Sequence, residues 1–397
     1  MKVLIVGAGI AGPTLAYWLK KTGHVPTLVE QAPELRRGGY VVDFWGTGFD
    51  VAEHMGISPW LLGQGYRVKE AREVTRNGRR ISRLNPLKVI DGATAGRYVS
   101  IARSDLSRII YDSLGGDVET IFADTVDSLD DDGEQVHVGF RSGLVRDFDL
   151  VIGADGLHSR VRELIFGPSS QFERSLGITV AAFQLDGYRP RDEDMAIMHT
   201  TVGAQALRLS LRDDATMFCF TFRNEGPVVL HDITAQQDLL RAAVRDMGWE
   251  VPAILERLPE ARPFYMDQAS QILMPSWSRG RVALVGDAAA CPSLLAGQGS
   301  ALAMVEAYVL AMALHASGGD HRVAFDQYEH SLSTIVRAKQ DAAIGLGSAF
   351  APRTRVGLLF RDAVFGLMGI PLVTRLAVGQ SLRDPIELPA PPTEAAV

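Results

Sequence analysis

The feature that most restricts the fold is a glycine-rich segment near the start of the chain, Gly7-Ala8-Gly9-Ile10-Ala11-Gly12. It follows an apolar run at 3–6 and precedes a helix-compatible stretch at 11–22. In such a strand–turn–helix unit the first glycine permits a tight turn, the second lets a pyrophosphate approach the backbone, and the third lets the helix pack on the strand. Glu30 ends the next predicted strand, where a carboxylate can accept hydrogen bonds from a ribose. The segment therefore predicts a nucleotide-binding βαβ unit and a parallel sheet, without distinguishing NAD from FAD.

Two further motifs also follow predicted apolar strands. One is Gly153-Ala154-Asp155-Gly156, with Ser159, Val161 and Arg162 behind it. The other is Gly286-Asp287-Ala288-Ala289, followed by Pro292 and Gly297-Gln298-Gly299. A short carboxylate at the end of a strand suits the hydroxylated chain of a cofactor, and the N-terminus of a following helix stabilises negative charge.

In this order and spacing, the three motifs resemble those of the class A flavoprotein monooxygenases, the para-hydroxybenzoate hydroxylase-like family, over nearly the whole chain. Residues 3–19, the Gly38-Gly39 turn with Asp43 behind it, and residues 276–310 look most like tetracycline-inactivating and polyketide-tailoring members. The resemblance implies an α/β fold: a Rossmann-like FAD-binding domain of the second glutathione reductase type (GR2-type), an inserted β-sheet substrate domain and a C-terminal helix.

The residue pattern supports a discontinuous organisation. We expect an FAD-binding domain at 1–72, 101–170 and 276–330, a substrate-binding domain at 73–100 and 171–275, a C-terminal helical segment at 331–388, and a flexible tail at 389–397. Asn77-Gly78, Asp132-Gly133 and Ser142-Gly143 predict the tips of hairpins. Ser104 is expected to cap a helix that runs to about Leu114.

The resemblance also assigns cofactor residues position by position. Glu30 would bind the adenosine ribose, Asp155 would lie where FAD and the nicotinamide cofactor approach one another, and Asp287 would hold the ribityl chain. Arg103 would reach the FAD from the start of a helix. Arg37 falls near a family arginine beside the cofactor, but the adjacent Arg36 is an equal candidate. The full expected set is Gly7, Gly9, Ile10, Ala11, Gly12, Glu30, Gln31, Arg37, Asp43, Arg103, Asp155, Asp287, Gly297, Gln298 and Gly299.

A substrate pocket is expected between the inserted sheet and the flavin. Aromatic side chains in that part of the sequence favour a planar, largely apolar substrate. The candidate wall residues are Phe44, Trp45, Gln184, His199, Arg208, Phe220 and Leu295. Three positions depart from the family pattern: Ala290 replaces a common His, Ser293-Leu294 a common proline pair, and Ala301 a common Asn. These departures leave the proton-transfer and substrate-orienting residues unassigned.

The resemblance implies an FAD-dependent monooxygenase that uses NAD(P)H and O₂. It would hydroxylate an aromatic or polyketide-like small molecule through a flavin C4a-hydroperoxide, so no protein nucleophile is expected. Inactivation of tetracycline-type antibiotics and Baeyer–Villiger oxygen insertion stay open. A flavin-dependent halogenase is disfavoured because the Trp-x-Trp-x-Ile-Pro stretch of those enzymes is absent, and a non-catalytic flavoprotein because the motif set is complete.

Composition restricts the partners. A net charge of −7 makes nucleic acid an unsuitable partner. The chain has two cysteines, Cys219 and Cys291, which predicts neither a disulfide framework nor a metal site and suggests a reducing cytoplasmic location. The apolar segment 356–378 is interrupted by charges and a proline, so no integral membrane segment is expected. The expected state is a monomer or homodimer.

Overall fold

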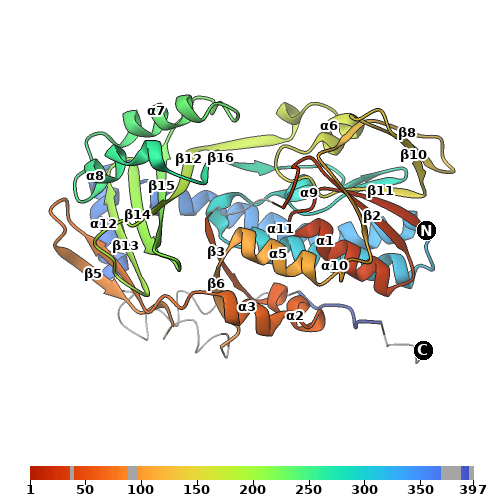
Figure 1. Ribbon diagram of the computed structural model, residues 1–397, viewed down its shortest axis with the longest axis horizontal. Helices are drawn as coiled ribbons and strands as arrows, with labels where there is room; N and C mark the ends of the chain where they lie inside the picture. Colours follow the sequence, from red (N-terminus) through yellow and green to blue (C-terminus); the bar gives the residue numbers. More distant parts are fainter. Residues whose placement is uncertain (36–39, 88–93, 95, 368–385, 393–397) are drawn as a thin grey trace.

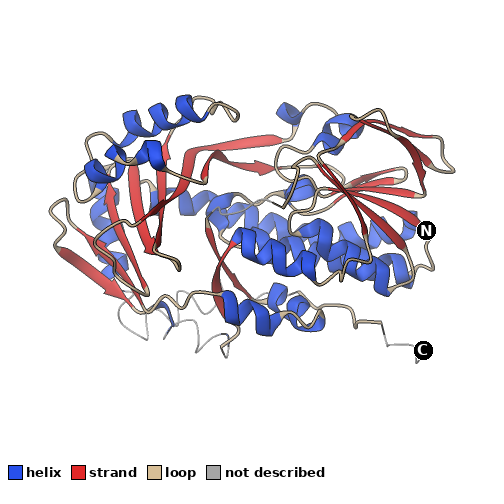
Figure 2. Ribbon diagram, viewed as in Figure 1, coloured by secondary structure: helices blue, strands red, loops and turns tan. Residues whose placement is uncertain are grey.

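The computed structural model describes residues 1–35, 40–87, 94, 96–367 and 386–392. Figure 1 shows two lobes: a helix-covered sheet that contains the N-terminus, and a second sheet flanked by α7 (Ile233–Val244) and α8 (Val251–Glu256). Figure 2 shows that helices and strands alternate in the first lobe, whereas strands dominate the second. The α/β fold with an inserted sheet domain is confirmed.

The first lobe is built on a six-stranded sheet with the order β17-β18-β11-β1-β2-β7. Its strands are β1 (Lys2–Val6), β2 (Val25–Glu30), β7 (Glu119–Phe122), β11 (Leu150–Gly153), β17 (Ser278–Arg279) and β18 (Val282–Leu284). Strands β18, β11, β1, β2 and β7 are parallel, and only the edge strand β17 is antiparallel. The carboxyl ends of β1, β11 and β18 therefore lie at one edge, which brings the three sequence motifs together.

The larger helices of this lobe pack on the sheet or on one another. They are α1 (Ala11–Lys21), α2 (Thr47–His54), α3 (Ser58–Gln64), α5 (Arg103–Asp112), α10 (Gly299–Ala316) and the long α11 (His321–Phe350). Among the described helices, α10 alone is long and apolar enough to cross a membrane. Its side chains from Ala301 to Leu314 are all buried, packed against α1, α2 and α11. Burial in the core of the lobe accounts for its apolar composition.

Turns predicted from the sequence occur where antiparallel strands meet. The strands β8 (Val126–Asp131), β9 (Val136–Phe140) and β10 (Val145–Phe148) form a small sheet whose two turns contain Gly133 and Gly143. Gly78, with a φ of +74°, lies in the turn between β4 (Glu70–Val74) and β5 (Arg80–Leu84). These three hairpin predictions are confirmed.

The second lobe is a seven-stranded sheet with the order β16-β12-β15-β14-β13-β4-β5. Its remaining strands are β12 (Glu173–Asp186), β13 (Met195–Thr201), β14 (Ala204–Ser210), β15 (Ala215–Arg223) and β16 (Phe264–Ile272). One face, which we call the back face, packs Phe183, Phe218 and Phe220 against α7 and α8. The opposite face, which we call the front face, carries Leu209, Met217 and Cys219 and packs against Tyr40 and Val41 of the first lobe. The front face is therefore the one that meets the nucleotide-binding lobe.

Several short elements complete the fold. They are β3 (Val41–Trp45), β6 (Tyr98–Ala102), α6 (Arg160–Phe166), α9 (Asp287–Ala290), α12 (Arg355–Leu367) and the 3₁₀ turns η1 (Ser169–Gln171), η2 (Leu258–Glu260) and η3 (Leu294–Ala296). β3 and β6 pair antiparallel beside the first lobe.

Some expectations about element ends were wrong. Helix α5 begins at Arg103 after Ala102, and no side chain caps it, so Ser104 is not its N-cap. The C-terminal helical segment begins at His321 rather than 331. Pro389, expected in a flexible tail, accepts a hydrogen bond of 2.6 Å through its carbonyl oxygen from the Tyr308 hydroxyl. This contact is long-range and could not be inferred from the proline-rich composition.

Candidate functional site

The glycine loop after β1 has three glycines with different surroundings. At Gly7, φ is +108° and a Cβ would lie 2.5 Å from the Ala154 carbonyl oxygen. At Gly12 a Cβ would lie 1.9 Å from the Gly7 carbonyl oxygen. At Gly9 the nearest atom to an ideal Cβ, 3.8 Å away, is a guanidinium nitrogen of Arg103. Gly7 and Gly12 are thus required by packing, whereas Gly9 leaves the backbone open to a ligand beneath an arginine.

Glu30 closes the loop from the neighbouring strand. Its two carboxylate oxygens accept hydrogen bonds of 2.9 Å from the backbone N–H groups of Ala8 and Ala32. Each carboxylate oxygen keeps a further acceptor site, which a ribose hydroxyl can use. Gln31, the next residue, is exposed at the rim.

Helix α5 brings Arg103 to the loop. The Arg103 backbone N–H donates to the Tyr40 carbonyl oxygen at 3.0 Å, and the Ser107 hydroxyl donates to the Gly9 carbonyl oxygen at 2.9 Å. These bonds fix the start of α5 against the glycine loop. Arg37 and its neighbour Arg36 lie outside the described residues.

Asp155 in the second motif is engaged by α6. Its carboxylate accepts hydrogen bonds from the Ser159 hydroxyl at 2.6 Å and from the backbone N–H groups of Arg160 and Val161 at 2.7 and 3.1 Å. Burial raises the pKa of Asp155, and these hydrogen bonds oppose the shift. The observed contacts stabilise the first turn of α6, so a contact with a nicotinamide cofactor would use the remaining acceptor capacity of this carboxylate.

Arg162 connects the second motif to the third and was given no role from the sequence. The side chain is fully buried, and its guanidinium donates to the carbonyl oxygens of Leu157 at 2.6 Å and Ala288 at 3.0 Å. Its spacing after Asp155 was the only available signal, because its acceptors are two backbone carbonyls and the Ser169 hydroxyl, 3.2 Å away, which no residue pattern connects to it. Arg162 fixes the two motif loops relative to one another.

The third motif forms a turn at the end of β18. Gly286 has a φ of +66°, Asp287 begins α9, and a Cβ on Gly299 would lie 3.7 Å from the Asp287 carboxylate. Gln298 accepts a hydrogen bond from the Lys339 ammonium group and directly precedes α10. Asp287 and the Gly297-Gln298-Gly299 loop therefore share one small site.

A buried carboxyl group of α10 supports this turn. Glu306 is 1% exposed, and its Oε2 accepts hydrogen bonds from the Gly286 N–H at 2.6 Å and the Tyr328 hydroxyl at 3.2 Å. Its Oε1 has no partner among the described residues. Burial raises the pKa of Glu306 to about 8. Sequence reasoning missed this residue because it lies in the middle of an apolar helix, 19 positions from Asp287.

The charge distribution of the site suits an anionic cofactor. Helices α1 and α10 begin at the glycine loop and at the third motif, and neither has a side-chain cap or an acidic residue in its first turn. Their N–H groups and positive dipole ends are therefore available to phosphate or to a reduced flavin. Together with the open backbone at Gly9, the Arg103 guanidinium and the Asp287 carboxylate, these features fit FAD.

The front face meets this site through contacts between the lobes. The Val41 N–H donates to Met217 Sδ at 3.2 Å, and Leu295 packs with Ile178 and Val180 of β12. His158, in the loop of the second motif, lies 2.9 Å from the Asp267 carboxylate on β16, and this carboxylate raises the pKa of the imidazole. The cofactor motifs and the front face thus form one continuous region.

The expected pocket-wall residues divide into two groups. Trp45, Gln184 and Leu295 come from elements that border the front face or the cofactor motifs. Phe44 is fully buried in the core of the first lobe. Phe220 packs on the back face, Arg208 pairs with Asp192 and Glu250, and His199 bonds to the Val74 carbonyl oxygen at 3.0 Å. The structure does not bring the last three together with the cofactor motifs, because strand alternation turns them to the back face, whereas Phe44 packs in the same core as Ala288 and Ala301.

Asp43, expected beside the cofactor, has partners of its own on β6. Its Oδ1 accepts hydrogen bonds of 2.6 Å from the hydroxyls of Tyr98 and Ser100. These bonds stabilise the β3–β6 pair, in which β3 runs from Val41, next to Tyr40, to Trp45.

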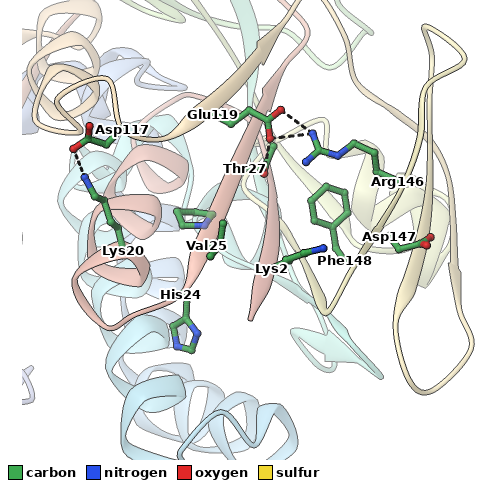
Figure 3. A pocket seen from close by; sticks show the side chains of 11 residues that line it. Lys2, Lys20, His24, Val25, Thr27, Asp117, Glu119, Arg146, Asp147 and Phe148 are labelled. Carbon is green, nitrogen blue, oxygen red and sulfur yellow. Dashed lines mark hydrogen bonds and ion pairs between the residues drawn. The ribbon is translucent and has the colours of Figure 1, made fainter.

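A cavity of about 620 Å³ lies at the other end of the first sheet (Figure 3). Two ion pairs lie within its lining, Lys20 with Asp117 and Arg146 with Glu119, the latter at 2.9 Å. It is bordered by Lys2 and Val25, at the amino ends of β1 and β2, opposite the three motifs. Ligands of open parallel sheets bind outside the carboxyl ends of the strands, so this cavity is not the candidate cofactor site.

Comparisons with known proteins agree with this geometry. The model of the FAD binding domain family matches residues 1–343. A flavin-dependent monooxygenase of an unknown prokaryotic organism is 36% identical over 357 residues, covering 88% of this chain and 90% of the relative. The crystal structure of the tetracycline destructase Tet(55) has a TM-score of 0.84 and 31% identity, with 98% of each chain covered. Klebsiella pneumoniae HpxO, complexed with FAD and uric acid, has a TM-score of 0.79 at 21% identity, with 96% of this chain and 95% of HpxO covered, and shows the shared fold.

Proposed function

Because this chain belongs to the family of flavin-dependent monooxygenases with an FAD binding domain, we propose that it uses NAD(P)H and O₂ to hydroxylate an aromatic or polyketide-like small molecule. The observation that carries the proposal is the meeting of three FAD-type motifs at one sheet edge, directly against the front face of the inserted sheet. The family resemblance stated from the sequence is confirmed, and so is FAD as its cofactor.

In the proposed site the first and third motifs have separate tasks. The loop at Gly7, Gly9 and Gly12 and the Arg103 guanidinium would bind the pyrophosphate, and Glu30 the adenosine ribose. Asp287 would accept a hydrogen bond from the ribityl chain, and the N–H groups at the start of α10 would stabilise negative charge at the ring. FAD, when bound, supplies hydride acceptance and oxygen activation. The front face would then hold the substrate and exclude water.

Inactivation of a tetracycline-type antibiotic is the second candidate. It is supported by the tetracycline destructase Tet(55), whose identity and coverage extend over both lobes. In both candidates the enzyme would add oxygen to its substrate, so the identity of the substrate distinguishes them.

The test begins with the purified protein. Chromatography of the released cofactor is expected to give FAD rather than FMN, because Glu30 and the glycine loop are arranged for an adenosine ribose and a pyrophosphate. NADH and NADPH oxidation is then measured with phenols, anthraquinones and tetracyclines, together with peroxide release and product mass.

A product heavier by one oxygen atom, formed in proportion to NAD(P)H consumed, would support the proposal. Release of FMN, or NAD(P)H oxidation that yields only peroxide with every compound, would contradict it.

A further inference from the structure

Tyr40 and Tyr265 meet at the junction of the two lobes. Tyr40 directly precedes β3, and Tyr265 lies on β16 of the substrate sheet. Their ring centroids are 5.4 Å apart and their planes are tilted by 44°. This is a direct aromatic contact between the nucleotide-binding lobe and the front face.

Neither phenol hydroxyl has a hydrogen-bond partner among the residues that the structure describes. Both side chains are half-buried, and a buried tyrosine hydroxyl ordinarily finds a partner. Burial raises the pKa of Tyr40 to about 12 and raises that of Tyr265 well above its ordinary value. Both phenols therefore stay protonated at neutral pH, and each can donate a hydrogen bond to a ligand.

The backbone of Tyr40 ties this phenol to the cofactor side of the junction, because its carbonyl oxygen accepts a hydrogen bond from the Arg103 N–H at 3.0 Å. Tyr265 meets it from the substrate sheet. Arg103 belongs to the cofactor side, since its guanidinium lies over Gly9. A molecule stacked between the flavin and the front face would thus have these hydroxyls at its edge.

The front face beside Tyr265 is small and apolar. In the sheet register Tyr265 pairs with Ala182, Ala182 with Cys219, and Cys219 with Leu207, so these four side chains form one row. Two residues further along β16, Asp267 is paired with His158 at 2.9 Å. The strands β12, β15 and β16 are all described. On their front face, Asp267 is the only charged side chain that lies within two residues of this row. Ala182 and Cys219 are small and leave width for a flat ring system, and within two residues of the row these described strands offer an aromatic carboxylate no uncommitted cation.

We propose that Tyr40 and Tyr265 donate hydrogen bonds to carbonyl or phenolic oxygens of a neutral, planar, fused-ring substrate, and that the site discriminates against aromatic carboxylates. This inference rests on the proposed function and specifies its substrate class. Tyr265 and the row beside it would contact the substrate from the substrate lobe, and Tyr40 would contact it from the cofactor lobe. Together they would determine which substrates bind.

The experiment measures binding rather than turnover. FAD-loaded protein is titrated by calorimetry with 1,8-dihydroxyanthraquinone and with anthraquinone-2-carboxylate, which share a ring system and differ in the charged group. The variants are Tyr265→Phe and Tyr40→Phe, each of which removes one hydroxyl. Tyr111→Phe is the matched control, because Tyr111 is a half-buried phenol of α5 without a described hydrogen bond and outside the junction. FAD content and the circular dichroism spectrum establish that each variant is folded.

The dihydroxy compound is expected to bind wild-type protein at least about tenfold more tightly than the carboxylate. Each junction variant is expected to weaken that binding by about threefold to tenfold, the range for loss of a neutral hydrogen bond. FAD content stays unchanged, and Tyr111→Phe binds as wild type does. Equal affinity in wild type and both folded junction variants would overturn the inference, as would tighter binding of the carboxylate or no binding of either compound.

Failure of the proposed function gives a different result. If the dihydroxy compound binds and both junction variants weaken it, but no tested compound gains an oxygen atom, the monooxygenase proposal fails while the binding inference stands. If another compound is oxygenated and the junction variants bind it as wild type does, the monooxygenase proposal stands and the binding inference fails.

Discussion

Two carboxyl groups, Asp287 and Glu306, lie on either side of the turn at Gly286 and differ in what surrounds them. Asp287 is half-buried and faces the glycine loop that ends at Gly299. Glu306 is buried and binds the Gly286 N–H from behind. At the scale of single residues, one carboxyl group is therefore available to a ligand and the other is part of the support of the turn.

Asp287→Ala is expected to weaken FAD binding with the fold retained. A charge-assisted hydrogen bond to a ribityl hydroxyl contributes roughly 1.5–3 kcal/mol, which corresponds to a loss of affinity of about tenfold to 150-fold. The apparent dissociation constant is measured by titrating FAD into apoprotein. Asp246→Ala, which removes an exposed carboxylate, serves as the control. Wild-type flavin affinity in Asp287→Ala would show that this carboxylate does not hold the cofactor.

Glu306 predicts a pH dependence of stability. Its folded pKa is about 8 against an ordinary value of 4.5, so between these values the folded protein keeps a proton that the unfolded chain releases. The free energy of unfolding therefore falls as pH rises through this window, by at most about 1.4 kcal/mol per pH unit. Glu306→Gln cannot titrate and is expected to flatten this slope while it keeps an acceptor for the Gly286 N–H.

Urea denaturation between pH 5.5 and 8.5, at matched FAD content, measures the slope. Glu256→Gln removes an exposed carboxyl group of α8 and should leave it unchanged. The same slope in wild type and Glu306→Gln would mean that Glu306 is not the group responsible.

At the scale of elements, α12 is held to the substrate sheet by one buried ion pair. The Arg361 guanidinium donates to Glu73 of β4 at 2.9 Å and to the Ala349 carbonyl oxygen at 2.8 Å. The second oxygen of Glu73 accepts from the Thr200 N–H at 2.9 Å, and Glu73 is 1% exposed. Burial raises the pKa of Glu73 in spite of this pairing. The ion pair therefore determines where α12 packs on the sheet, whether or not it adds to the net stability of the protein.

Arg361→Ala is expected to destabilise the protein by about 3–5 kcal/mol, because Glu73 is left buried without its partner. The double variant Glu73→Gln/Arg361→Met should recover most of this loss, since no unpaired charge remains. Thermal unfolding compares them, with Arg355→Ala, an exposed arginine at the start of α12, as the control. A double variant as unstable as Arg361→Ala would show that the cost comes from lost packing rather than from the unpaired charge.

The elements also show which parts of the fold a sequence can predict. Strands, hairpins and the βαβ unit follow from local patterns, so Gly78, Gly133 and the glycine loop were identified correctly. Alternation along β14 and β15 separates two faces but does not tell which one meets the other lobe. For this reason Arg208 and Phe220, expected in the pocket wall, lie on the back face, and Tyr265 and Met217 were not selected.

The candidate site was predictable only where local geometry determines it. The three glycine motifs can be identified from their own spacing, whereas Arg162 and Glu306 act through backbone groups more than ten residues away. Side chains that bind distant backbone atoms leave no periodic signal in the sequence, and tertiary structure is needed to find them.

At the scale of the whole molecule, the two lobes meet through contacts that a substrate would touch. Tyr40 and Tyr265 are in ring contact across the junction, and His158 is paired with Asp267 across the same boundary. Binding in this region can therefore change how the lobes hold the cofactor. One glycine motif of the dinucleotide-binding type is present in the sequence, so a second nucleotide is expected to bind only transiently.

We expect flavin reduction by NAD(P)H to be slow in the free enzyme and at least several-fold faster with substrate bound. A ligand shifts a conformational equilibrium only by binding one state better than the other, and a tenfold difference corresponds to about 1.4 kcal/mol. The hydrogen bonds proposed for Tyr40 and Tyr265 supply a difference of this size. Without such control, reduced flavin would react with O₂ and release the hydride equivalents as peroxide.

Anaerobic stopped-flow reduction, with and without a compound shown to be hydroxylated, measures the effect. Tyr265→Phe should lower the acceleration by substrate. Equal rates with and without substrate in wild type would show that reduction is not controlled by substrate binding.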